Sequence, residues 1–176
     1  VPVLREVVTD LPNVKVVEAD ATRADWDALL AGADRWTLIA NLPYNVATPL
    51  VCDLLDEVPA IRSMLVMVQR EVAERFPAAP GSKQYGAVSV KIAYWATARI
   101  VGHVPASVFV PRPNVESALV RIDRREPPEV DRGTLFGLVR TAFGQRRKML
   151  RRSLASPVTP EQFGAAEVSP EARPEQ

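Results

Sequence analysis

Four consecutive residues, Asn41, Leu42, Pro43 and Tyr44, carry the groups needed for chemistry on an aromatic amine. The exocyclic amine of adenine is a weak nucleophile because its lone pair is delocalised into the ring, so an enzyme must accept both of its hydrogens. The Asn41 amide oxygen and the Leu42 carbonyl can do so, because Pro43 stiffens the turn and disfavours a helical Leu42. Tyr44 offers a ring face to a flipped base. In isolation, the motif fits an ordinary strand-to-helix turn equally well.

Short runs rich in β-branched residues alternate with helical patterns along the first two-thirds of the chain, which predicts an α/β sheet. The runs expected to form strands are Val14–Glu18, Trp36–Asn41, Ser63–Gln69, Arg99–Val104 and Ser117–Ile122. Asn41 therefore ends a predicted strand, and open α/β sheets bind ligands at the carboxyl ends of their strands. This location supports a functional interpretation of the motif.

The predicted helices follow cap signals and apolar spacing. Thr22 is expected to open a helix that carries Trp26, and Thr48-Pro49 to cap a helix over Leu50–Glu57. Two further helices are predicted at Arg70–Arg75, with oppositely charged side chains four residues apart, and at Val88–Ala98. The core is expected to include Trp26, Trp36, Trp95 and Cys52.

The composition changes after Ile122, where Asp123–Glu129 reads as a charged, proline-bearing linker. Apolar residues at helical spacing follow, so we predict two domains, an α/β domain over residues 1–125 and a small helical domain over residues 126–176. Thr159-Pro160, with Gln162 as its capping-box partner, and Ser169-Pro170 are the helix starts expected in the tail.

The overall composition is that of a globular chain, with 47% apolar and 24% charged residues and a net charge of +1. A single cysteine excludes an internal disulfide, and no apolar run is long enough for a membrane span. We therefore expect a cytoplasmic protein that does not contact membranes. His103 is the only histidine and is expected to be a packed or surface residue, and no metal site is predicted.

The positive charge is unevenly distributed. The stretch Thr141–Ser153 contains no acidic residue and five cations, Arg146, Arg147, Lys148, Arg151 and Arg152. Such a cluster is either a solvated helix face or a surface that binds the phosphates of a nucleic acid. Because uncompensated cations repel one another, we favour the phosphate-binding interpretation.

Three segments in the same order resemble a known family, the bacterial small-subunit ribosomal RNA adenine dimethyltransferases associated with kasugamycin sensitivity. They are NLPYNVATPL at 41–50, VPASVFVPRPNVESALV at 104–120 and FGQRRKMLRRSL at 143–154. Residues 66–90 are also similar to the family, so the resemblance covers nearly the whole chain.

The resemblance implies a Rossmann-like class I methyltransferase sheet and S-adenosyl-L-methionine as the methyl donor. The expected reaction is N6,N6-dimethylation of two adjacent adenosines near the 3′ end of small-subunit ribosomal RNA, coupled to ribosome biogenesis, with the small ribosomal subunit as partner of a monomeric enzyme. By the same resemblance, residues 41–44 form the target-adenine motif and Phe109 lies on the other side of the flipped base. Asp20, Ala21 and Asn41 are expected to contact the cofactor, and the five cations to bind RNA.

Two family features are absent from the sequence, namely the glycine-rich cofactor loop and the acidic residue that binds the ribose hydroxyls. We therefore expect the natural protein to extend beyond both ends of this chain, and the 176 residues alone to bind RNA without methylating it.

Three alternatives stay open. The macrolide-resistance branch methylates large-subunit RNA with the same chemistry, although FGQRRK at 143–148 and Ser117 favour the small-subunit branch. A DNA adenine methyltransferase would share the asparagine-proline-tyrosine turn but not the C-terminal match. A non-catalytic RNA-binding ribosome-assembly factor would use the basic stretch alone.

Overall fold

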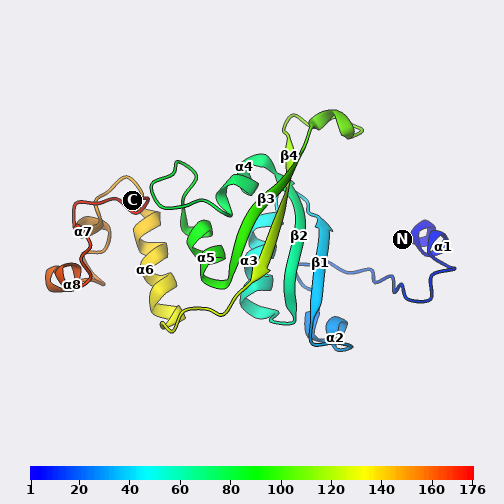
Figure 1. Cartoon of the computed structure of the whole chain (residues 1–176), viewed down its shortest axis with the longest axis horizontal. Helices are drawn as coiled ribbons and strands as arrows, with labels where there is room; N and C mark the ends of the chain where they lie inside the picture. The colour runs from blue at the N-terminus through cyan, green and yellow to red at the C-terminus, as the bar shows by residue number, and fades with distance from the viewer.

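The computed structural model describes residues 1–176 and is built around one four-stranded mixed sheet (Figure 1). The strands are β1 (Trp36–Asn41), β2 (Ile61–Gln69), β3 (Ala96–Val104) and β4 (Ser117–Arg124), in the order β1-β2-β4-β3. β1 and β2 run parallel, whereas β4 is antiparallel to both β2 and β3.

The strand register brings distant segments to one edge of the sheet. Asn41 at the end of β1 is opposite Met67 of β2, and Gln69 at the end of β2 is opposite Ser117 at the start of β4. The carboxyl ends of β1 and β2 therefore lie beside the amino end of β4. This edge positions the candidate site.

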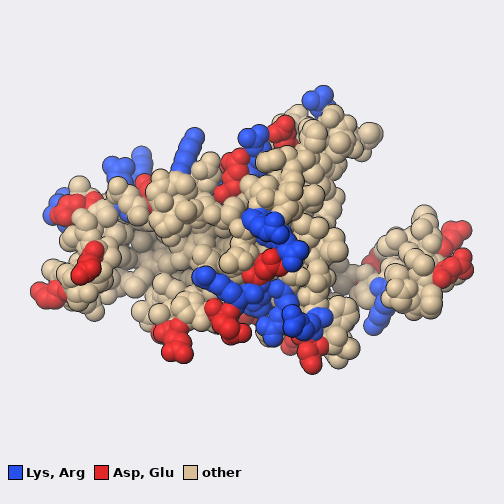
Figure 2. All heavy atoms as spheres, viewed as in Figure 1, with Lys and Arg blue, Asp and Glu red and all other residues tan.

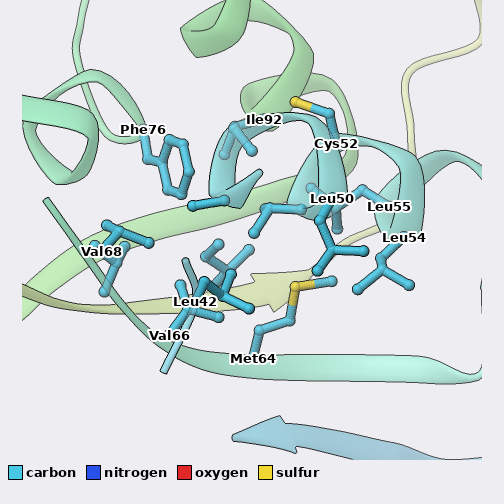
Figure 3. Close-up of a cluster of buried hydrophobic side chains, with 14 of the residues drawn as sticks. Leu42, Leu50, Cys52, Leu54, Leu55, Met64, Val66, Val68, Phe76 and Ile92 are labelled. Carbon is cyan, nitrogen blue, oxygen red and sulfur yellow. The ribbon is translucent and has the colours of Figure 1, made fainter. Parts of the chain in front are cut away.

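Helices cover one face of the sheet. In Figure 1, α3 (Ala47–Glu57) lies behind the strands, and α4 (Arg70–Arg75) and α5 (Ala87–Trp95) flank it. Figure 3 shows α3 packing its leucines against β2 side chains, among them Met64 and Val66. The main core contains 19 buried residues, and each fully buried large aliphatic or aromatic side chain stabilises the fold by about 1.5 to 3 kcal/mol.

The other face of the sheet carries no helix. Alternate residues point to opposite faces of a strand, so Thr37, Ile39 and Asn41 share this open face. Ile39 is 76% exposed there.

The Arg124 guanidinium fixes the junction between α3 and β2. It donates hydrogen bonds to the carbonyls of Leu54, Leu55 and Val58 at the end of α3, and to that of Ile61, at 2.8 to 3.1 Å. Its carbon also lies 5.6 Å from the centre of the Trp95 ring. One cation thus binds four carbonyls at this helix end, of which those of Leu54 and Val58 also accept a backbone amide.

The C-terminal region is helical, with α6 (Arg132–Gly144), α7 (Leu150–Ser153) and α8 (Pro160–Ala165). Ala142, Leu154 and Phe163 form a separate small buried cluster. α6 packs on α5 through edge-to-face rings, with 5.2 Å between the centres of Tyr94 and Phe136. None of the helices is long and apolar enough to cross a bilayer.

Two short helices precede the sheet, α1 (Pro2–Val7) and α2 (Trp26–Leu30). The prediction of a strand at Val14–Glu18 is wrong, because these residues form no ladder and β1 pairs only with β2. Four of the five predicted strands are confirmed; β1 has the predicted bounds, and the other three are longer by two or three residues at one end. One extension, β4 to Arg124, takes the first residues of the predicted linker into the sheet.

Several predicted helix boundaries are also wrong. The cap of α2 is Asp25, whose carboxylate accepts from the Ala28 amide, and not Thr22. α3 begins at Ala47, before the expected cap Thr48. α5 ends at Trp95, because the extended Ala96 already pairs with β4.

Of the two helix starts predicted in the tail, one is confirmed and the other is wrong. The capping box of Thr159 and Gln162 is confirmed at the start of α8. No helix follows Ser169-Pro170, because this turn is tied to α7 by hydrogen bonds from the Arg151 amide to Pro170 and from the Leu150 amide to Ala172.

Candidate active site

A pocket at the edge described above joins two segments that are far apart in the sequence. It has a volume of about 350 Å³, which lies in the range of small-molecule sites. Its lining consists of Asn41, Leu42, Pro43, Tyr44, Phe109, Val110, Pro111 and Pro113. The structure thus brings together the two motifs that the sequence predicts to face one base.

The turn after β1 leaves two acceptors unused. The Leu42 side chain is buried, and its amide donates to the Met67 carbonyl at 3.1 Å, which continues the ladder beyond Asn41. The Pro43 carbonyl accepts from the Val46 and Ala47 amides and so begins α3. Neither the Asn41 side-chain amide nor the Leu42 carbonyl has a hydrogen-bond partner in the structure, which leaves both able to accept from a ligand.

Two half-buried aromatic rings border the pocket. The Tyr44 hydroxyl lies 2.9 Å from the Ser117 Oγ, and Ser117 is fully buried at the start of β4. Phe109 follows a short 3-10 turn, η1 (Ala106–Val108), and belongs to neither buried cluster. The two rings make no direct contact with each other. A planar ligand in the pocket can therefore contact an aromatic ring from each segment.

The contact between Tyr44 and Ser117 is absent from the sequence prediction, which used Ser117 only to distinguish two branches of a family. Local patterns give no sign of it, because the two residues are 73 positions apart. The sheet order β2-β4, with Gln69 opposite Ser117, is what brings them together.

Asp20 and Ala21 offer an acceptor beside a donor. The Thr22 hydroxyl and amide both donate to Asp20 Oδ1, at 2.8 and 2.9 Å, which lowers the pKa of the Asp20 carboxyl and keeps it ionised. Asp20 Oδ2 and the Ala21 amide make no hydrogen bond in the structure. This pair matches the amine and the ring nitrogen on the Watson–Crick edge of an adenine. No direct contact joins Asp20 to Asn41.

The basic stretch Thr141–Ser153 does not form one continuous helix. α6 ends at Gly144, the next residues form turns, and only Arg151 and Arg152 lie on the four-residue α7. Acids from the tail approach two of the five cations, with 4.0 Å between Arg146 and Glu175 and 3.5 Å between Arg151 and Glu171. The stretch therefore does have compensating acids in space, and three exposed cations, Arg147, Lys148 and Arg152, have no ion pair.

Other reactive side chains lie outside the pocket. His103 is exposed on β3, as expected for a surface residue. Cys52 is buried in α3, where desolvation raises the pKa of its thiol to about 11 and keeps it neutral. Trp26 and Trp95 pack against the core, but Trp36 is 36% exposed, so its assignment to the core is wrong.

Comparison with known proteins defines the class of this chain. The sequence profile described as "Ribosomal RNA adenine dimethylase" matches residues 1–173. The chain therefore belongs to the ribosomal RNA adenine dimethylase family, as the three resembling segments predict.

Relatives described as "Ribosomal RNA small subunit methyltransferase A" occur in several bacteria. The chain is 45% identical to that of Cutibacterium acnes over 98% of its own length and 57% of the relative's. It is 48% identical to that of Kineococcus radiotolerans, over 93% of the chain and 56% of the relative. For Acidothermus cellulolyticus the identity is 55%, over 69% of the chain and 43% of the relative. The chain thus spans about half the length of these relatives.

Two solved structures share the fold. A dimethyladenosine transferase from Plasmodium falciparum superposes with a TM-score of 0.72 at 24% identity, over 94% of this chain and 57% of that one. The 23S rRNA methyltransferase ErmE gives a TM-score of 0.74 at 23% identity, over 99% of this chain and 71% of that one. The sheet is therefore of the Rossmann-like kind found in ribosomal RNA adenine methyltransferases.

Proposed function

We propose that this chain forms the target-adenine half of an enzyme that dimethylates the N6 amine of two adjacent adenosines near the 3′ end of small-subunit ribosomal RNA. The observation that carries the proposal is the shared pocket of residues 41–44 and Phe109, with two free acceptors and two aromatic rings in its lining. The relatives named for small-subunit RNA support this substrate over large-subunit RNA.

In the proposed mechanism, a flipped adenine lies between the rings of Tyr44 and Phe109. Its amine donates one hydrogen to the Asn41 side-chain oxygen and the other to the Leu42 carbonyl, so that the nitrogen lone pair is freed from the ring. S-adenosyl-L-methionine would supply a sulfonium-bound methyl group, and its sulfur would leave as a neutral thioether. Positioning would do most of the work, and the proton lost by the methylated amine would pass to water, so no general base is required of the protein.

The residues available for the cofactor are Asp20 and Ala21. The Asp20 carboxylate would accept from the cofactor's adenine amine, and the Ala21 amide would donate to its ring nitrogen. Asn41, at the end of β1, would meet the methyl-donor side. The free Asp20 Oδ2 and Ala21 amide support this assignment.

The five cations of residues 146–152 are proposed to contact RNA phosphates, with the exposed and unpaired Arg147 as the leading candidate.

Replacing Arg147 and Arg151 together by glutamine should weaken binding to small-subunit RNA. The slope of log affinity against log salt should fall by about 0.7 to 0.9 per lost phosphate contact. Fluorescence anisotropy over a range of salt concentrations measures both. If affinity and slope were both unchanged, residues 146–152 would have a structural role and would not bind RNA phosphates.

Ser117 is proposed to position Tyr44. Ser117→Ala removes the bond to the phenol, worth about 1 kcal/mol, and should lower methylation roughly fivefold. In a Tyr44→Phe background, which already lacks the phenol, the same change should have no further effect. An equal loss in both backgrounds, measured by initial rates, would show that Ser117 acts through general stability instead.

The proposed enzyme is a cytoplasmic monomer that acts on the small ribosomal subunit during its biogenesis. Its division at residues 125 and 126 into a catalytic and a helical RNA-recognition domain is supported by the two separate buried clusters.

The test is to incubate the full-length protein with immature small subunits and methyl-labelled S-adenosyl-L-methionine. Label in small-subunit RNA, recovered as dimethyladenosine, is the expected result. Label in large-subunit RNA would favour the macrolide-resistance chemistry. RNA binding without any label would favour a non-catalytic assembly factor.

A further inference from the structure

A second cationic surface lies at the opposite end of the sheet from the adenine pocket. A hollow of about 450 Å³, called here the arginine hollow, is lined by Arg35, Trp36, Thr37, Arg62, Ser63, Arg121, Asp123 and Arg124. Figure 2 shows Lys and Arg side chains gathered over the lower ends of the strands, where β1 and β2 begin. Four arginines thus surround one opening with a single acid.

Two of the four arginines of the hollow form hydrogen bonds within the protein, and the other two do not. Arg124 is used by the α3 carbonyls, and Arg121 forms two hydrogen bonds to Asp123 at 2.8 and 3.1 Å. Arg35 and Arg62 are exposed and have no ion pair or side-chain hydrogen bond in the structure. These two guanidinium groups are therefore free to bind an external anion.

The placement of the charges is unfavourable for the chain alone. Arg99 of β3 lies directly opposite Arg121 of β4 in the ladder, and like charges in that arrangement destabilise a sheet. Arg62 also lowers the pKa of Arg124, second only to burial, because the two cations repel each other. An anionic partner would relieve this repulsion, and planar guanidinium groups are well suited to phosphate.

One residue of the hollow and one residue of the adenine pocket lie on the same face of β1. Thr37 lines the hollow, Asn41 lines the pocket, and both point to the open face of β1. Thr37 and Asn41 are four residues apart on β1, which separates them by about 13 Å. An RNA that places an adenosine in the pocket can therefore reach the hollow with a neighbouring segment of its backbone.

We propose that the arginine hollow is a second RNA-binding surface, which holds backbone phosphates of the substrate through Arg35 and Arg62. This site is distinct from the basic segment at residues 146–152. The inference rests on the proposed function only in taking the polyanion to be the substrate RNA.

The test replaces Arg35 and Arg62 together by glutamine in the full-length protein and leaves the structural residues Arg121 and Arg124 intact. A matched control, Arg5→Gln with Lys15→Gln, removes the same charge from two exposed residues of the N-terminal segment. Binding to a labelled 3′ fragment of small-subunit RNA is measured by anisotropy over a range of salt concentrations.

Loss of two phosphate contacts should lower the slope of log affinity against log salt by about 1.4 to 1.8 and weaken binding about 30-fold at 0.1 M salt, whereas the control should change neither by more than about a third of that. An equal effect in the control would overturn the proposal, because it would reflect net charge alone. An unchanged slope would also overturn it, since the hollow would then be filled by protein or reserved for a small anion. RNA binding that depends on Arg35 and Arg62, in a protein that methylates nothing, would support the hollow and contradict the proposed function.

Discussion

Replacing Asn41 with alanine in the full-length protein is expected to reduce methylation below detection, by at least about a hundredfold, with RNA binding close to that of the unmodified protein. The Asn41 amide is one of two unpaired acceptors at the pocket and is the only side chain among them. Its removal leaves the reacting amine with only the Leu42 carbonyl as acceptor. Single-turnover methylation rates and RNA affinities, measured on the same preparations, separate the two effects.

The matched control for this variant is Asn13→Ala, which removes the same side chain from an exposed position in the N-terminal segment. It should leave both rate and affinity unchanged. Near-normal turnover of Asn41→Ala would refute the assigned mechanism, because the amine would then not depend on this acceptor.

The second large loss of methylation efficiency is expected on substitution of the aromatic rings of Tyr44 and Phe109. Tyr44→Ala and Phe109→Ala should each weaken capture of the flipped base by about 1 to 3 kcal/mol, which corresponds to a loss of roughly 5- to 150-fold in methylation efficiency. The cause is the loss of one stacking face on each side of the base. The values of kcat/KM for small-subunit RNA measure the effect.

Leucine at either position distinguishes stacking from packing, because it keeps much of the apolar volume but has no π face. Tyr44→Leu and Phe109→Leu should therefore lose activity nearly as the alanine variants do, with a smaller change in thermal stability. Leucine variants that altered only the melting temperature would identify the two rings as anchors of the fold.

Local sequence patterns predicted most elements of this fold because each depends on nearby residues. Residues 36–41 read as a strand from their own composition, and Thr159 reads as a helix cap together with Gln162. Val14–Glu18 has the same β-branched character but forms no strand, because a strand also needs a neighbour with which to exchange hydrogen bonds. Such pairing cannot be inferred from the segment alone.

The candidate site likewise has features that local sequence predicts and features that depend on contacts between distant segments. The turn at Asn41 could be predicted because proline and the preceding strand define it locally. The bond from Tyr44 to Ser117 and the proximity of Arg62 to Arg124 depend on β4 lying beside β2 in the sheet. The acids near Arg146 and Arg151 come from a tail more than 15 residues further on, so the basic stretch looked uncompensated in sequence.

Photo-crosslinking tests most directly whether the pocket holds the target base. One of the two target adenosines is replaced by 8-azidoadenosine in small-subunit RNA, the complex with the full-length protein is irradiated, and the attached peptides are sequenced by mass spectrometry. Attachment within residues 41–44 or at Phe109, lost on competition with unmodified RNA, is the predicted result. Crosslinks confined to the arginine hollow or to residues 146–152, with none in the pocket, would contradict it, because the base would then never leave the RNA for this site.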